Sequence, residues 1–210
     1  MAEVARHLLA LGARLVYGGD LRPGGFTDVL FELIARYRRD ADLVDERVGV
    51  TNVLAWPVHI NLETRELRHI SESLRGVADI IYLKVDGSEL PHGERYQMQK
   101  RQANDEECVD GLTSVRNFIT RASTARVSLG GKVQGFKGRM PGIAEEALAA
   151  LHVSQPLFLL GGFGGCAHDI VEELGLSPRA VFRPWASREA FASFSHKDLN
   201  NGLSLDDNAV

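Results

Sequence analysis

The residues best suited to chemistry gather in one glycine-rich, basic stretch, residues 130–148. Its first part, residues 130–142, holds five glycines with Lys132, Lys137 and Arg139, and no acid. Glycine lets backbone N–H groups approach a phosphate, and basic side chains neutralise its charge. Glu145 and Glu146 follow in a predicted first helical turn, where acids also complement the helix dipole. Adjacent helical residues point about 100° apart, so at most one of them faces a pocket squarely.

Two further glycine clusters follow apolar runs. The stretch 16–26 reads VYGGDLRPGGF, and Leu160 is followed by Gly161 and Gly162. The carboxyl ends of parallel strands share one edge of a sheet, and ligands bind there. One glycine turn by itself is more often a plain connection, but three on one edge, two of them with basic residues, favour a site for an anionic ligand. The segment 91–97, PHGERYQ, is either a surface helix start or a further contact at that edge through His92, Glu94 and Arg95.

The sequence lacks the residue spacing that several other chemistries require. The chain has no G-x-x-x-x-G-K-[ST] motif, and GGFGG at 161–165 lacks the G-x-G-x-x-G order. The seven histidines show no metal-ligand spacing, so no metal site is predicted. Ser195-His196 lacks a nucleophile elbow, which disfavours a serine hydrolase. Cys108 and Cys166 have no neighbouring His or Lys, which predicts reduced, unreactive thiols.

Composition bounds the class of protein. The chain has 210 residues, 44% hydrophobic and 25% charged, with a net charge of −4. These values are typical of a globular domain, and an acidic balance argues against nucleic acid as a partner. No apolar run reaches the ~18 residues of a membrane span. The N-terminal residues lack the pattern of a signal peptide, so we expect a cytoplasmic protein.

The elements that must position these residues alternate between strands and helices. This rhythm predicts a Rossmann-like α/β fold, a mainly parallel sheet flanked by helices. The first helix leads directly into a strand, like the second half of a βαβ unit, so we expect that the strand that opens such a unit is missing here. We expect one domain over residues 1–190 and a polar, mobile tail over 191–210, and residues 67–70 stay ambiguous. The predicted strands are 14–17, 50–56, 78–85, 125–129 and 156–160, and the predicted helices are 2–11, 27–37, 93–124, 142–151 and 166–174.

Three motifs together carry a resemblance to a known family. YGGDLRPGGFT (17–27), GRMPGIAEEAL (138–148) and LFLLGGFGG (157–165) resemble the SLOG superfamily, over roughly residues 1–175. The superfamily includes the Lonely Guy phosphoribohydrolases. The chain looks closest to divergent branches found in bacterial conflict systems alongside TIR proteins, which implies sensing of an ADP-ribose- or NAD-related signal.

The resemblance also assigns roles to residues. The Lonely Guy motif P-G-G-x-G-T-x-x-E lies over Gly130-Gly131 and, after an insertion, over residues 142–146, so that Glu146 matches the catalytic acid. Arg139 takes the place of the active-site arginine. A carboxylate beside the anomeric carbon stabilises an oxocarbenium-like state, and an arginine holds phosphate. Ile143 replaces the motif's threonine and the loop is longer, which weakens the case for catalysis more than the case for binding.

Three hypotheses therefore stay open. The first is a binding module for a nucleotide-derived signal, the second a nucleotide N-glycosidase using Arg139 and Glu146, and the third a structural partner domain. The implied partners are a nucleotide-like ligand, a TIR or other effector protein and a second copy of the chain, with no cofactor, metal, nucleic acid or membrane. Phe136 is an additional candidate for base stacking. The predicted ligand contacts are Gly18, Gly19, Asp20, Arg22, Gly25, Phe26, Thr27, Gly130, Gly131, Lys132, Lys137, Arg139, Pro141, Gly142, Glu145, Glu146, Gly161, Gly162 and Phe163.

Overall fold

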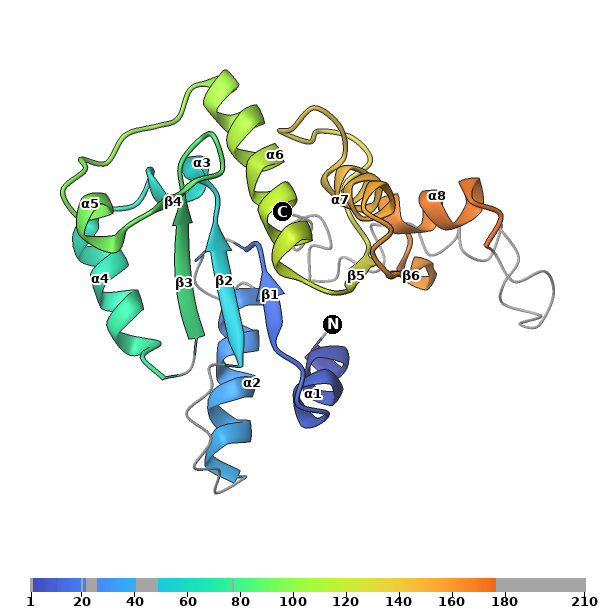
Figure 1. Cartoon of the computed structure of the whole chain (residues 1–210), viewed down its shortest axis with the longest axis horizontal. Helices are drawn as coiled ribbons and strands as arrows, with labels where there is room; N and C mark the ends of the chain where they lie inside the picture. Colours follow the sequence, from blue (N-terminus) through green and yellow to red (C-terminus); the bar gives the residue numbers. More distant parts are fainter. Residues whose placement is uncertain (1, 20, 22–25, 41–48, 77, 177–210) are drawn as a thin grey trace. The chain divides into compact units, whose positions relative to one another are not determined.

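The structure, a computed structural model, is an α/β protein whose described residues form two compact units. It describes residues 2–19, 21, 26–40, 49–76 and 78–176 (Figure 1). Unit 1 comprises Met1–Thr124 with Lys137–Arg139, and unit 2 comprises Ala125–Phe136 with Met140–Val210. The predicted tail 191–210 lies outside the described residues, and the single-domain boundary at residue 190 stays a prediction.

Unit 1 is built on a four-stranded sheet in the order β1-β2-β3-β4. The first three strands are parallel and the fourth is antiparallel to β3. These strands are apolar and rich in β-branched residues, as buried parallel strands are expected to be. This confirms the predicted Rossmann-like, mainly parallel α/β class. The strands are β1 (Leu15–Tyr17), β2 (Val50–Leu54), β3 (Ala78–Leu83) and β4 (Glu89–Leu90).

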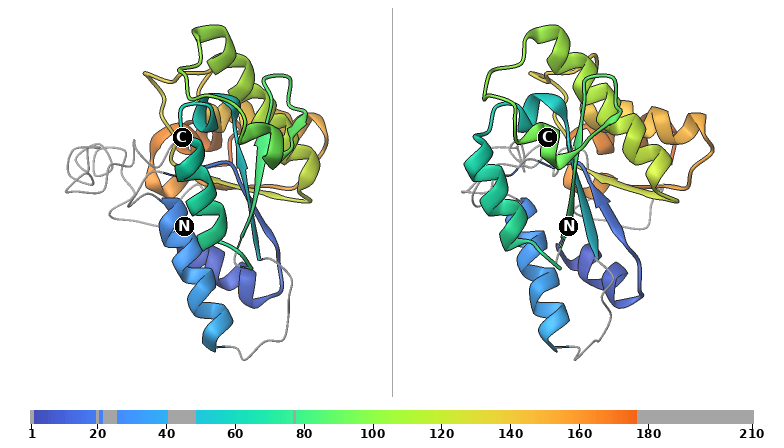
Figure 2. Two further views of the ribbon diagram at one scale, coloured as in Figure 1. Left: turned by 90° about the vertical axis from the view of Figure 1, so that its left-hand side faces the viewer. Right: turned by 60° about the vertical axis from the view of Figure 1, so that its left-hand side comes forward.

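Helices cover both faces of this sheet (Figure 2). Alternate strand residues point to opposite faces, so Val50 and Leu54 join one core and Val53 joins the other. The first core includes α1 (Ala2–Ala10), α2 (Phe26–Asp40) and α4 (Thr64–Ser73). The second core is closed by α6 (Asp105–Ala122) through Val115 and Ile119.

The connection between β2 and β3 holds two helices rather than one ambiguous segment. A short helix, α3 (Trp56–His59), starts with Pro57 in its first turn, where the missing proline N–H costs nothing. Residues 67–70, ambiguous by sequence, lie inside α4. Leu67 of α4 is fully buried.

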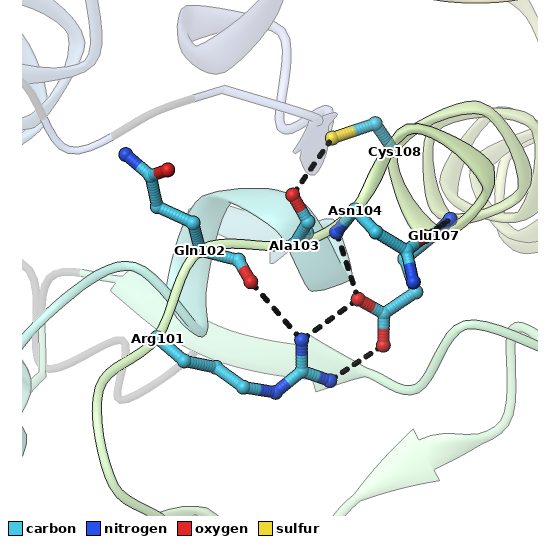
Figure 3. A network of polar contacts seen from close by, with 6 residues as sticks. All are labelled: Arg101, Gln102, Ala103, Asn104, Glu107 and Cys108. Carbon is cyan, nitrogen blue, oxygen red and sulfur yellow. Dashed lines mark hydrogen bonds and ion pairs between the residues drawn. The ribbon is translucent and has the colours of Figure 1, made fainter.

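The predicted long helix 93–124 is wrong. A short helix, α5 (His92–Arg95), is separated from α6 by a segment without helix. Asn104 caps α6 by accepting the Glu107 amide, while the Glu107 carboxylate accepts the Asn104 amide and the Arg101 guanidinium (Figure 3). These bonds lower the pKa of Glu107 to about 2. The capping box thus fixes the start of α6 at residue 105.

Gly111 is a buried glycine inside α6. A Cβ atom there would lie 2.8 Å from Cδ of Pro57 and 3.2 Å from Cβ of Trp56. The missing side chain therefore lets α3 and α6 approach closely.

Unit 2 is built on two parallel strands, β5 (Arg126–Leu129) and β6 (Leu157–Leu160). Their register pairs Arg126 with Leu157 and Leu129 with Leu160. After β5 comes the glycine-rich loop and then α7 (Gly142–His152). After β6 come a 3-10 turn, η1 (Gly161–Phe163), and α8 (Gly165–Glu173). Across the described ranges, no helix is both long and apolar enough to cross a membrane.

Candidate functional site

In unit 2 the glycine turn after β5 is bonded to the start of α8. The amide of Cys166 donates to the carbonyl of Gly131 at 2.9 Å, and that of Ala167 donates to the carbonyl of Gly130 at 2.8 Å. Gly130 and Gly131 both have positive φ angles, of 61° and 94°, which turn these carbonyls toward the helix. N–H groups in the first turn of a helix attract phosphate when they are free. In α8 these two N–H groups are instead bonded to the protein's own backbone.

Replacing Gly165 by alanine should disrupt this junction. Its φ is +66°, and a Cβ would lie 2.6 Å from the carbonyl oxygen of Gly131 and 2.8 Å from the carbonyl carbon of Gly130. Strain and backbone overlap together should lower the free energy of unfolding by about 2 kcal/mol or more. Urea unfolding followed by circular dichroism measures the change.

Gly162→Ala is the matched control. No atom lies within 4 Å of a Cβ built on Gly162, and its φ is not positive. We expect a change of no more than about 0.5 kcal/mol. Equal effects of the two substitutions would contradict the proposed role of the Gly165 contact.

The N-terminus of α7 differs from that of α8. Its N-cap is Pro141, without a side-chain cap, and among the described residues no partner is recorded for the amides of Gly142 and Ile143. The amide of Ala144 points at the Cys166 sulfur, and burial raises the pKa of this thiol, as expected for an unreactive cysteine. The side chain of Ile143 lies over Gly131, whose added Cβ would come within 2.4 Å of Ile143 Cγ1. At the start of α7, after the basic loop, the amides of Gly142 and Ile143 are thus free, within the described part of the chain, to bind a ligand.

Glu146 is bonded to a buried arginine on β5. Nη1 of Arg126 donates to Oε2 of Glu146 at 2.7 Å, and the side chain of Arg126 is only 7% exposed, against 26% for Glu146. Arg126 reaches α7 from β5, so Glu146 points toward the strand, and Glu145 points about 100° away from it. Glu146 is thus the glutamate whose carboxylate oxygen this bond holds.

The resemblance assigns Arg139 and Glu146 to one catalytic pair, but in the structure Arg139 is bonded to another residue. Arg139 bonds to Asp110 of α6 at 2.7 Å, and both side chains are exposed. Arg139 and Lys137 belong to unit 1, whereas Glu146 belongs to unit 2. Lys132, half-buried, is the basic loop residue that belongs to unit 2. The roles of Arg139 and Lys137 toward a ligand stay predictions.

In unit 1 the glycine turn after β1 is closely packed. A Cβ on Gly18 would lie 2.7 Å from Ile119 Cδ1, and one on Gly19 would meet the ring of Tyr17 and the hydroxyl of Thr27. The Gly19 amide donates to Oδ1 of Asn52 on the neighbouring strand at 3.3 Å. Thr27 is buried at the start of α2. The predicted residues Asp20, Arg22 and Gly25 lie outside the described residues, as does the side chain of Phe26.

The turn after β6 contributes an aromatic side chain. A Cβ atom built on Gly161 would lie 3.1 Å from Cγ2 of Val171, whereas a Cβ atom on Gly162 would face open space. Phe163 is 52% exposed, so it is not a core residue, and Phe136 of the basic loop is 40% exposed. Both rings are accessible to a ligand base.

The three glycine turns do not all follow strands of one sheet. The turns after β5 and β6 share the carboxyl edge of the two-stranded sheet, as predicted. The turn after β1 belongs to the sheet of unit 1.

Arg95 is not a ligand contact. The antiparallel strand β4 turns the chain back along β3, where Nε2 of His92 bonds to the carbonyl of Ile80 at 2.8 Å. Arg95 is fully buried and donates to Nδ1 of His59 and to the carbonyls of His59 and Leu62. Arg95 therefore serves the fold of unit 1, while contacts of His92 and Glu94 with a ligand stay predictions.

Two polar residues in strands were missed by the sequence prediction. Arg126 opens the strand RVSL, and Asn52 lies in the apolar strand VTNVL. A single polar residue inside a buried strand was the available signal, because burial of such a group requires a partner. In both cases the side chain contacts a residue already on the candidate list, Glu146 or Gly19.

Comparisons with known proteins place the chain in a family. Searches of curated proteins and of solved structures found no match. A family model described as SLOG cluster2 matches residues 1–202 and spans both units. This match suggests a nucleotide-related function and confirms the resemblance drawn from the glycine motifs. The chain therefore belongs to the SLOG family.

Proposed function

We propose that the protein binds a nucleotide-derived ligand, related to ADP-ribose or NAD, and acts as a sensor in bacterial defence or signalling. The observation that carries the proposal is the difference between the two helix starts in unit 2. The first amides of α8 are bonded to Gly130 and Gly131, whereas those of Gly142 and Ile143 in α7 have no recorded partner among the described residues. A phosphate suits the open start of α7, which ends the basic loop.

The ion pair beneath α7 supports a ribose contact. Arg126 binds Oε2 of Glu146, and no partner within the described part of the chain is recorded for Oε1. A carboxylate oxygen fixed in this way suits a ribose hydroxyl, which donates a hydrogen bond. Arg126 also offsets the charge that Glu146 would otherwise present to a phosphate at the same helix start.

The loop and the turn after β6 supply further groups. Lys132 offers a positive charge, and the exposed rings of Phe136 and Phe163 offer surfaces on which a base could stack. These groups support recognition of a complete nucleotide rather than of phosphate alone.

A second candidate function is nucleotide phosphoribohydrolase activity of the Lonely Guy type. It is favoured by Glu146, which matches the motif's acid and whose carboxylate Arg126 holds in place. In that reaction water replaces the base at the anomeric carbon, the N–glycosidic bond breaks, and the base leaves with a proton. Glu146 would stabilise the positive charge that develops on the sugar.

One experiment separates the two candidates. The purified protein is incubated with AMP, NAD, ADP-ribose and cyclic ADP-ribose, and thermal shift and free base are followed together. A rise in melting temperature without base release supports the sensor. Base release supports the enzyme if Glu146→Gln abolishes it while Glu145→Gln, the same change one residue earlier, preserves it. No response to any nucleotide would refute both.

The effector is proposed from the family's setting. We expect a TIR or other effector protein as partner and a homodimer in solution. Co-purification with a neighbouring TIR protein and size-exclusion chromatography with light scattering test these two points, and a monomer without any effector would contradict them.

A further inference from the structure

Helix α7 carries an apolar stripe outside the face that it turns toward its sheet. Ala147 and Ala150 are buried and mark its inner side. Ala144, Leu148 and Leu151 follow one another at spacings of four and three residues, which aligns them along the helix. Leu148 is 43% exposed and Leu151 is 49% exposed. An exposed stripe with this spacing is typical of a helix that packs against a second helix.

Opposite charges flank this stripe. Glu145 lies three residues before Leu148 and His152 lies four residues after it, so both lie on one side of the stripe. The acid stands in the first turn of α7 and the histidine in its last turn. Glu145 is half-buried and His152 is exposed. Reversing the direction of the helix therefore exchanges the two charges.

A second α7 that runs in the opposite direction complements the first. Its Leu148 lies next to Leu148 of the first copy near a twofold axis, and each Leu151 meets the small side chain of Ala144. Each Glu145 lies beside His152 of the other copy, and a ring N–H of that histidine can donate to the carboxylate in either protonation state. The same surface thus serves on both copies, as an isologous contact requires.

The charges favour a second copy over the end of the same chain. Residues 177–197 hold four Lys or Arg and one Glu, so they complement Glu145 but repel a protonated His152. A copy of α7 supplies a partner for both. We propose that α7 packs antiparallel against α7 of a second copy of the chain, with each Glu145 bonded to His152 of the other. This inference rests on the proposed homodimer, to which it gives a surface, and it is independent of the nucleotide ligand.

Sedimentation velocity at a series of protein concentrations tests the surface. We expect the wild type to dimerise and Leu148→Lys to raise the dissociation constant of the dimer by about tenfold or more. Val29→Lys changes an apolar side chain of similar exposure, 46%, on α2, and should dimerise like the wild type. A wild type that stays monomeric would refute the homodimer and its surface, whereas an unchanged dimer of Leu148→Lys would refute the surface alone. Lower stability of the Leu148→Lys monomer than of the wild-type monomer would also overturn the proposal, because the chain itself would then cover the stripe. Ligand binding is measured separately, so the proposed nucleotide site stands or falls on its own titrations.

A charge exchange tests the antiparallel pairing. Glu145→Lys places a lysine beside His152, and His152→Glu places a glutamate beside Glu145, so each variant alone should dimerise about tenfold more weakly. In an equal mixture the new lysine of one copy lies beside the new glutamate of the other, and we expect mixed dimers about as stable as those of the wild type. A mixture as weak as its two components would overturn the pairing. Circular dichroism shows whether the variants fold, and if one does not, Leu148→Lys decides.

Discussion

Replacing Glu146 by leucine should lower the free energy of unfolding by about 3 kcal/mol, because it removes the carboxylate from a buried guanidinium. Arg126 is 7% exposed and donates to Glu146 at 2.7 Å. Taking an arginine out of water is tolerated when a charged acceptor meets it, and it is costly when that acceptor is removed. Urea unfolding gives the change, and hydrogen exchange of peptides from β5 and α7 locates it.

A double-mutant cycle isolates the ion pair. Arg126→Met alone should cost less, about 1–2 kcal/mol, because the remaining Glu146 carboxylate is partly exposed and stays hydrated. The double variant, Arg126→Met with Glu146→Leu, should be clearly more stable than the sum of the two single changes predicts. Additive effects would show that the two side chains do not act as a pair.

This ion pair links stability to the site. A leucine pair could hold α7 on β5 equally well by packing, so the charges are not required for the fold. They do fix the orientation of the carboxylate of Glu146 at the start of α7. Under the proposed function, this orientation prepares the carboxylate for a ligand hydroxyl.

Sequence reasoning identified most elements of the fold because their signals are local. Apolar runs ending in glycine marked β1, β5 and β6, and the helix-favouring run GIAEEALAAL at residues 142–151 marked α7. The prediction of one long helix over residues 93–124 was wrong because its charged residues suit a helix as well as a loop. What separates α5 from α6 is a set of contacts with distant residues, such as the Arg101 amide with the carbonyl of Ile60.

The candidate site was predictable only in part. Glu146 was found because its motif is contiguous, but its partner Arg126 lies on a strand twenty residues earlier, and no local pattern joins the two. Basic residues in a loop all look alike in sequence. The structure distinguishes them, since Arg139 is paired with Asp110 whereas Lys132 belongs to the unit that holds Glu146.

Acid should destabilise unit 1 through His59, beginning near pH 6.5, above the pH at which carboxylates start to titrate. His59 is fully buried, and burial lowers its pKa from 6.5 to about 4, helped by the positive charge of Arg95 and opposed by the bond of its Nε2 to the carbonyl of Leu83. Its Nδ1 accepts from Nε of Arg95 at 3.0 Å, which only a neutral ring can do. The unfolded chain therefore binds a proton at a higher pH than the folded one.

The sign and size of this effect follow from linkage. The contribution of His59 to stability is fully present above about pH 6.5 and is lost as the pH falls toward 4, by roughly 3 kcal/mol in all. Urea unfolding at intervals between pH 7 and pH 4.5 measures it. In His59→Gln the side-chain amide can still accept from Arg95 and donate to Leu83 without titrating, so its stability should fall much less over this range. Parallel curves for the two proteins would show that the proton enters elsewhere, and that the buried Arg95 does not depend on a neutral His59.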